Sequence, residues 1–249
     1  MRWTIGSDID GTLTGDAVAL QRLAGRIAAF RAAGGKFALV TGRSYGEALC
    51  GLVDEGLPMA DAIITQVGTE IYLPPFVPDQ SPLAAWSTQL QQAFTHQRAV
   101  DFVEPDGQWV LQSGKANTAL KASWWYVGRG DPDAAAQRVA ARVAEHPDYR
   151  MIWSSGRDLD ILPATAGKGC ALRFLVEYWQ RDADACVVAG DTGNDINMIE
   201  AFSRGIVVAN AQAELLRFGR ERNGDTVFMA SHPYAAGVEQ GLDYWSVLP

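Results

Sequence analysis

Residues 186–190 (Cys-Val-Val-Ala-Gly) form an uninterrupted apolar run, which is typical of a strand buried on both faces of a parallel sheet. Similar short runs lie at 37–40, 62–65 and 205–208, and another begins at Trp3 near the N-terminus. Segments with leucine and isoleucine at helical spacing separate these runs. Strands that alternate with helices in this way predict an α/β fold built on one doubly wound parallel sheet.

The middle of the chain breaks this alternation. Prolines cluster between Pro74 and Pro82, which is typical of a chain that leaves one domain for another, and Pro163 marks the return. The pattern between them predicts helices at 83–98 and 133–145 and strands at 108–112, 121–127, 150–154 and 158–162. The sequence therefore predicts a core made of residues 1–73 and 163–249 and an inserted α+β domain made of residues 74–162.

Composition limits the partners of the chain. Its 249 residues carry a net charge of −8 at pH 7 and only four lysines, so no basic stripe is available to track a nucleic acid. No apolar run approaches the ~18 residues of a membrane span. The three cysteines are widely separated, which fits reduced thiols better than a disulfide framework. We expect a cytoplasmic monomer with neither nucleic acid nor membrane as a partner.

Two carboxylates, Asp8 and Asp10, lie one residue apart where the first apolar strand ends. Ligands of open α/β sheets bind beyond the carboxyl ends of the strands. Because alternate residues of a strand share a face, we expect the two side chains to converge on one cation or one phosphorus. The motif alone leaves catalysis open, since Asp-x-Asp also occurs in chance turns and in the metal sites of nucleotide-sugar transferases.

Three further polar segments occupy comparable positions. Thr41 ends the second strand before a helix, Lys168 opens another helix, and the run Asp-Thr-Gly-Asn-Asp at 191–195 follows the strand at 186–190. Taken alone, Thr41 could equally cap the helix together with Ser44. Together the segments supply carboxylates, one hydroxyl and one ammonium, which suit phosphoryl transfer with Mg²⁺. The histidines are scattered and no nucleotide phosphate loop occurs, which disfavours zinc chemistry and a kinase.

The sequence resembles the haloacid dehalogenase superfamily of phosphatases, whose four motifs it matches in order at 8–12, 40–43, Lys168 and 190–195. The insertion between the second and third motifs is similar to the superfamily's C2-type cap. This resemblance implies a Rossmann-like core that carries an α+β cap domain. Finer matches to the sucrose-phosphate phosphatase family lie at 66–72, 154–163 and 208–216.

The resemblance implies a role for each motif. Asp8 would be the nucleophile, attacking phosphorus in line to give an aspartyl-phosphate. Asp10 would protonate the leaving sugar oxygen and then activate the hydrolytic water. Thr41 and Lys168 would bind the transferring oxygens, and Lys168 would also offset the repulsion between two anions.

The resemblance also implies a Mg²⁺ site formed by Asp8, Asp10, Asp191 and Asp195. Asp8, the backbone carbonyl of Asp10 and Asp191 would contact the ion. Asp195 and Asn194 would orient metal-bound water and the lysine of the third motif.

Substrate contacts are implied for Thr41, Gly42, Arg43, Gly68, Thr69, Glu70, Lys121, Lys168 and Asn194. Two of these positions keep an alternative: Glu70 could equally form a hinge salt bridge, and Lys121 could equally face solvent. Closure of the cap over the acyl-phosphate would exclude bulk water from the site.

The expected reaction is hydrolysis of a sugar phosphate, with sucrose 6-phosphate as the first candidate. Arg157 stands where lysine is common in the family, and its planar fork differs from a point charge, so mannosylfructose phosphate and other glycosyl phosphates stay open. The segment 41–43 disfavours a phosphomutase, because phosphomannomutases resemble Gly-Gly-Ser there. Intact Asp8, Asp10 and Lys168 disfavour a non-catalytic regulatory domain. The enzyme could act beside a glycosyl-phosphate synthase.

Overall fold

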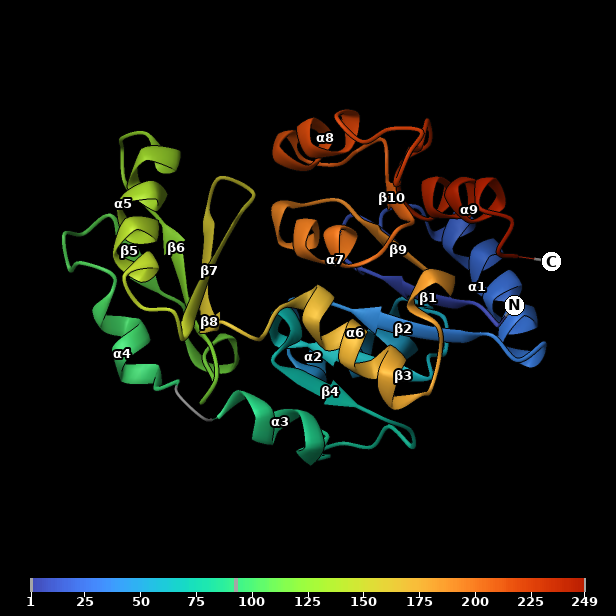
Figure 1. Ribbon diagram of the computed structural model, residues 1–249, viewed down its shortest axis with the longest axis horizontal. Helices are drawn as coiled ribbons and strands as arrows, with labels where there is room; N and C mark the ends of the chain where they lie inside the picture. Colours follow the sequence, from blue (N-terminus) through green and yellow to red (C-terminus); the bar gives the residue numbers. More distant parts are fainter. Residues whose placement is uncertain (1, 92–93, 249) are drawn as a thin grey trace.

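The computed structural model describes residues 2–91 and 94–248 and shows two lobes of unequal size (Figure 1). The larger lobe contains a seven-stranded sheet in the order β11-β10-β9-β1-β2-β3-β4. Its strands are β1 (Thr4–Ser7), β2 (Lys36–Val40), β3 (Ala62–Thr65), β4 (Glu70–Tyr72), β9 (Cys186–Gly190), β10 (Gly205–Val207) and β11 (Val227–Met229). All neighbours pair in parallel except β3 and β4, which are antiparallel. The predicted α/β core is confirmed, and the antiparallel edge strand is an addition to it.

Helices cover both faces of this sheet. They are α1 (Ala17–Ala32), α2 (Tyr45–Asp54), α6 (Lys168–Tyr178), α7 (Ile196–Ala201), α8 (Ala213–Arg220) and α9 (Tyr234–Tyr244). A Cβ added to Gly205 would meet Ile199 of α7, whereas the neighbouring Ile206 contacts Gly241 of α9. Because successive residues of a strand point to opposite faces, α7 and α9 lie on opposite sides of the sheet, as a doubly wound fold requires.

Helix α1 illustrates how local sequence produces this packing. Its N-cap is Asp16, whose carboxylate accepts hydrogen bonds from two backbone amides of the first turn. Leu20, Leu23, Ile27 and Phe30 recur at helical spacing and are all buried against the sheet. The helix is therefore fixed by a cap at one end and an apolar stripe along one side.

The smaller lobe contains an antiparallel sheet in the order β5-β6-β8-β7. Its elements are β5 (Trp109–Leu111), β6 (Ala122–Tyr126), β7 (Tyr149–Ser154), β8 (Asp158–Pro163), α4 (His96–Asp101) and α5 (Pro132–Ala144). The ring of Trp109 packs edge-on against Tyr126 and Trp153, and Trp124 is buried. Large aromatic side chains thus supply much of the core of this small lobe, which we call the cap.

The structure corrects the helix predicted at 83–98. Two separate helices, α3 (Ala84–Leu90) and α4, occupy this stretch, and residues 92–93 lie outside the described part. Helix α3 packs on the core, because the indole of Trp86 donates to the carbonyl of Gly68 at 3.1 Å and its ring lies 5.1 Å from that of Phe174. The first helix of the insertion therefore belongs spatially with the larger lobe.

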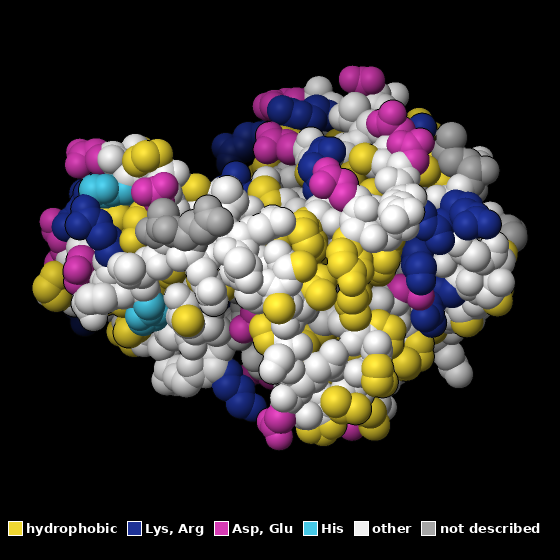
Figure 2. All heavy atoms as spheres, turned by 60° about the horizontal axis from the view of Figure 1, so that its bottom comes forward, with side chains coloured by type: hydrophobic (Ala, Val, Ile, Leu, Met, Phe, Trp, Pro, Cys, Tyr) yellow, Lys and Arg dark blue, Asp and Glu magenta, His cyan; other side chains and the backbone are white. Residues whose placement is uncertain are grey.

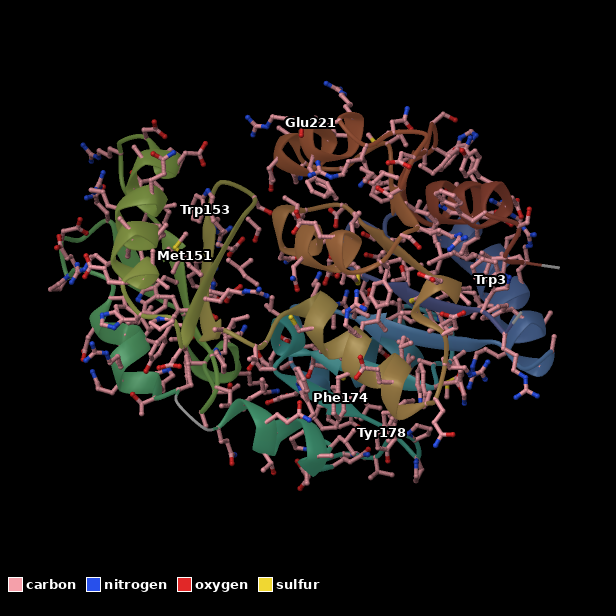
Figure 3. The ribbon with its side chains drawn as sticks, viewed as in Figure 1. Trp3, Met151, Trp153, Phe174, Tyr178 and Glu221 are labelled. Carbon is pink, nitrogen blue, oxygen red and sulfur yellow. The ribbon has the colours of Figure 1, made fainter. Side chains whose placement is uncertain are left out.

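The face shown in Figure 2, the lower side of Figure 1, carries hydrophobic side chains near its middle. Phe174 and Tyr178 extend from α6 on the side of the molecule where α3 lies (Figure 3). With Trp86 they line a cavity of about 560 Å³. Among residues 2–91 and 94–248, no helix combines the length and apolar character needed to cross a bilayer.

Candidate active site

The sheet order brings three of the predicted motifs side by side. Asp8 follows β1, Thr41 follows β2 and Asp191 follows β9, and these strands are neighbours in the order β9-β1-β2. Lys168, the first residue of α6, reaches the same edge. Side chains separated by up to 183 positions in the chain thus meet at the carboxyl ends of three adjacent strands.

The centre of this site is a buried lysine between two carboxylates. The Nζ of Lys168 donates to Asp8 Oδ1 and to Asp195 Oδ1, at 2.7 Å in each case, and all three side chains are almost fully buried. Burial opposes the charged ammonium, but Asp195 and Asp8 outweigh it and raise the pKa of Lys168. The lysine is therefore a fixed positive charge in contact with the predicted nucleophile.

Asp8 and Asp191 share a hydroxyl donor. Thr12 Oγ1 lies 3.1 Å from Asp191 Oδ1 and 3.4 Å from Asp8 Oδ2. Burial raises the pKa of Asp8 well above its ordinary range although Lys168 opposes the shift. Burial, together with the charge of Asp195, also raises the pKa of Asp191 to about 6. The carboxylates of Asp8, Asp191 and Asp195 together carry more negative charge than the single ammonium of Lys168 neutralises.

The positions of these carboxylate oxygens fit a metal ion. Oxygens of Asp8, Asp191 and Asp195 all lie within 4.8 Å of one another and are buried. Carboxylate oxygens are the ligands of hard cations such as Mg²⁺. Both oxygens of Asp195 are already used, one by Lys168 and the other by the amides of Asp191 and Thr192. The donor set fits a divalent cation, with Asp8 and Asp191 holding the freer oxygens.

Gly11 makes room for this cluster. Its φ of 74° is a left-handed backbone conformation, and an added Cβ would lie 2.2 Å from Asp191 Oδ2. A side chain at this position would therefore both strain the turn and push into the carboxylate.

Asp10 lies differently from the expectation that it shares a face with Asp8. Its carboxylate is 60% exposed and accepts two hydrogen bonds from Arg43, at 2.7 and 2.9 Å. Strand β1 ends at Ser7, so the alternation of faces on which the expectation rested does not extend to residues 8–10. Asp10 and Asp8 line one cavity, but the carboxylate of Asp10 is outside the buried acidic cluster.

Thr41 and Ser44 have separate tasks. Ser44 is the N-cap of α2 and forms a reciprocal capping box with Glu47. Thr41 is fully buried, and its Oγ1 accepts a hydrogen bond from the amide of Arg43 at 3.1 Å. Capping of the helix is thus complete without Thr41.

A cavity of about 260 Å³ joins the core site to the cap. Of the residues predicted from sequence, its lining includes Lys121 from the cap and, from the core, Asp8, Asp10, Gly42, Arg43 and Asn194. Lys121 is buried with its Nζ 3.6 Å from Asp160 Oδ1, so the solvent-facing alternative is wrong. A second chamber of about 470 Å³ shares Gly42 and Lys121 with the first. The space beyond the buried lysine thus continues into the cap.

The predicted segment 68–70 does not line either chamber. Glu70 accepts hydrogen bonds from Thr65 and from Tyr72, both at 3.0 Å, and Thr69 donates to the carbonyl of Gln66. Among the ion pairs of the described residues none includes Glu70. In this structure the segment braces the connection between β3 and β4.

Sequence reasoning missed several residues that line the cavity from the cap: Gln112, Ser154, Asp158 and Asp160. Burial raises the pKa of Asp158 despite the nearby Arg157, whose guanidinium lies 5.2 Å from the ring of Trp125. The match at 154–163 was the available signal for three of these residues, whereas nothing in the local sequence marks Gln112.

A buried acid and lysine at the strand ends of a doubly wound sheet, beside an inserted α+β cap, agree with the resemblance to the haloacid dehalogenase superfamily of phosphatases. The sequence model of one of its families, sucrose-6F-phosphate phosphohydrolase, matches residues 1–246. The chain belongs to this family, and it is a phosphoric monoester hydrolase.

The chain is also similar to individual proteins of known name. The chain is 34% identical over 259 residues to a mannosylfructose-phosphate phosphatase of Agrobacterium fabrum, covering 98% of this chain and 97% of that one. It is 29% identical to a glucosylglycerol-phosphate synthase of Pseudomonas anguilliseptica, covering 98% of this chain but 31% of the synthase. The sucrose-phosphatase of Synechocystis solved with sucrose and phosphate superposes with a TM-score of 0.90 at 28% identity, over 99% of each chain.

Proposed function

We propose that this enzyme hydrolyses a disaccharide phosphate, with sucrose 6-phosphate as the first candidate, through a phosphorylated Asp8 in the presence of Mg²⁺. One observation carries this proposal: the cavity runs from the Lys168-bound carboxylate of Asp8 to polar residues of the cap. A phosphoryl group at Asp8 would leave its sugar in the space between the two lobes. The cap then contacts the leaving group rather than the reacting phosphorus.

The first step would make one bond and break one. An oxygen of Asp8, held in place by Lys168 and Thr12, would form the bond to phosphorus as the bond from phosphorus to the sugar oxygen breaks. Asp10 would supply the proton to the departing sugar oxygen. Lys168 would remain charged throughout and offset the negative charge of the transferring group.

The second step would reverse the role of Asp10. Asp10 would take a proton from water, which attacks the phosphorus of the acyl-phosphate and restores Asp8 with release of inorganic phosphate. Asp8, Asp191 and the backbone carbonyl of Asp10 would hold Mg²⁺, whose charge would screen the nucleophile from its anionic substrate. Asp195 would keep Lys168 and the amides of residues 191 and 192 in position.

A second candidate substrate is mannosylfructose phosphate. The observation that favours it is the full-length 34% identity to the Agrobacterium enzyme of that name. Arg157 stacks over Trp125 instead of lining the cavity, so this departure from the family pattern does not decide between the two disaccharides. The match to part of a glucosylglycerol-phosphate synthase supports a further proposal, that a glycosyl-phosphate synthase supplies the substrate.

Phosphate release tests the proposal. Purified enzyme with Mg²⁺ would be given sucrose 6-phosphate, mannosylfructose 6-phosphate, glucose 6-phosphate and mannose 6-phosphate, with Asp8→Asn as the blank. Strong preference for one disaccharide phosphate would support the proposal and name the substrate. Equal, weak release from all four sugars would reject disaccharide specificity, and release by Asp8→Asn equal to that of the unaltered enzyme would reject the assigned nucleophile.

A further inference from the structure

The cap touches the core at a point away from the two chain connections. The turn between β7 and β8 extends from the cap toward the segment before α7 (Figure 1). Ser155 and Gly156 form this turn with φ values of 57° and 60°. The segment opposite is the short 3₁₀ turn Gly193–Asp195, which contains residues of the fourth motif. This contact therefore lies directly beside the catalytic carboxylates.

One side chain joins the two sides of this contact. Glu214 is the second residue of α8, and its Oε1 accepts a hydrogen bond from the amide of Ser155 in the cap at 3.0 Å. The same oxygen accepts one from the amide of Gly193 in the core at 3.2 Å. A carboxylate that accepts two backbone amides makes strong, charge-assisted hydrogen bonds. Glu214 thus bridges the tip of the cap and the catalytic turn.

The fit of Gly193 independently supports a close contact here. A Cβ added to this glycine would lie 2.8 Å from the carbonyl oxygen of Trp153 and 3.1 Å from Cγ of Glu214. Trp153 lies on β7 just before the turn (Figure 3). The two lobes therefore approach so closely that a methyl group at residue 193 does not fit between them.

The bridged turn also holds parts of the active site. Thr192 and Asn194, on either side of Gly193, line the cavity, and Asp195 positions Lys168. We infer that Glu214 is a positioning residue that holds the cap over the cavity and couples its closed position to the catalytic turn. This inference rests on the proposed sugar phosphatase function, since only a substrate that reaches the cap depends on closure.

Two substrates separate this role from a purely structural one. Sucrose 6-phosphate would extend into the cap, whereas p-nitrophenyl phosphate offers a small leaving group with no sugar hydroxyls. We expect Glu214→Ala to lower kcat/KM for sucrose 6-phosphate by ~5- to 150-fold, mainly through KM, the range of typical coupling between two sites. Turnover of p-nitrophenyl phosphate by Glu214→Ala should stay within about twofold of that of the unaltered enzyme. Glu214→Gln, which keeps an acceptor oxygen, should recover most of the lost kcat/KM for sucrose 6-phosphate.

Glu221→Ala is the matched control, because Glu221 caps the same helix at the end opposite Glu214 and its side chain is exposed. It should leave both substrates unaffected. Equal loss on both substrates in Glu214→Ala, or no loss on either, would overturn the positioning role.

Amide hydrogen exchange supplies a readout that does not depend on the sugar. The amide of Ser155 is protected by Glu214 in the structure, so exchange in the segment 153–157 should accelerate in Glu214→Ala and stay slow in Glu221→Ala. Unchanged exchange would overturn the bridge itself. Accelerated exchange in an enzyme that hydrolyses no disaccharide phosphate would uphold the bridge and reject the proposed substrate instead.

Discussion

Arg43 binds Asp10 through two nitrogens, Nη2 to Oδ1 at 2.7 Å and Nε to Oδ2 at 2.9 Å. Both residues line the cavity, and a bidentate guanidinium–carboxylate pair fixes distance and orientation together. Arg43 also donates to Glu55, which does not line the cavity, at 2.9 Å. The residue assigned to proton transfer is thus held in place by a chain of charges rather than by the strand that precedes it.

Replacing Arg43 tests this arrangement. We expect Arg43→Ala to lower kcat by up to ~100-fold, because small misplacement of a catalytic group has an effect of that size. Arg43→Lys should recover little of the lost kcat, since one ammonium does not reproduce the planar, bidentate guanidinium. Steady-state phosphate release measures both variants. Glu55→Gln is the milder comparison, and a larger effect of Glu55→Gln than of Arg43→Ala would contradict the arrangement.

Removal of the buried lysine should weaken both chemistry and folding. Lys168→Met leaves Asp8 and Asp195 buried without their partner, and the loss of one member of a buried pair costs about 3–5 kcal/mol in the free energy of unfolding. Urea unfolding at pH 7 without metal measures this loss. The double variant Lys168→Met/Asp195→Asn should recover part of the stability, because it removes one of the stranded charges; purely additive destabilisation would count against the pairing.

Metal binding should be visible without any turnover. At a Mg²⁺ concentration 100 times its Kd, the folded enzyme should gain about 2.7 kcal/mol in stability, which raises Tm by several degrees. Asp191→Asn should abolish most of this increase, because Asp191 belongs to the buried acidic cluster. Asp225→Asn, a change at an exposed carboxylate, is the control and should keep the full shift. Thermal unfolding with and without Mg²⁺ measures the change in Tm for each variant. Equal increases in Tm for Asp191→Asn and Asp225→Asn would reject the proposed metal site.

Acid should weaken a second carboxylate site, remote from the cavity. Asp61 accepts hydrogen bonds from Arg31, Lys36 and the amide of Phe37. Burial alone would raise the pKa of Asp61, but these partners outweigh it and lower the pKa. Because the folded pKa lies below the unfolded value of about 3.9, the contribution is present above that pH and disappears as pH falls through the folded pKa.

Asp61→Asn should therefore destabilise the fold by about 1.5–3 kcal/mol at pH 7, the usual range for hydrogen bonds to a charged group. The difference from the unaltered protein should shrink as the pH falls below about 4. Urea unfolding across this pH range measures it, with the exposed Asp54→Asn as the control. A difference that stays constant with pH would show that the charge of Asp61 plays no part.

The sequence was sufficient to predict that Asp8, Lys168 and Asp191 lie together and that Thr41 follows the adjacent strand, because each one ends a buried strand or opens a helix and parallel strands bring these ends to one edge of the sheet. It was insufficient for Asp10, whose position depends on where β1 ends and on Arg43, 33 residues away. A difference of one or two residues in a strand end changes which way a side chain points.

The cap side of the cavity was harder to predict for a different reason. Gln112 follows β5 and Asp158 begins β8, and both reach the cavity only because the two lobes close on one another. Glu70 resembled a substrate residue by its sequence neighbours, but the pairing of β4 with β3 directs it to Thr65 and Tyr72. Contacts that arise between lobes leave little trace in local periodicity.

The cavity has two walls of separate origin in the chain, with Asp8 and Asp10 just beyond β1 on one side and Lys121 of the insertion on the other. This division allows substrate preference and reaction chemistry to evolve independently. Substitutions in the insertion can change which sugar is preferred, while the residues of the core that carry out phosphoryl transfer stay unchanged. Relatives that act on different glycosyl phosphates are then expected to differ most in the wall that the insertion provides.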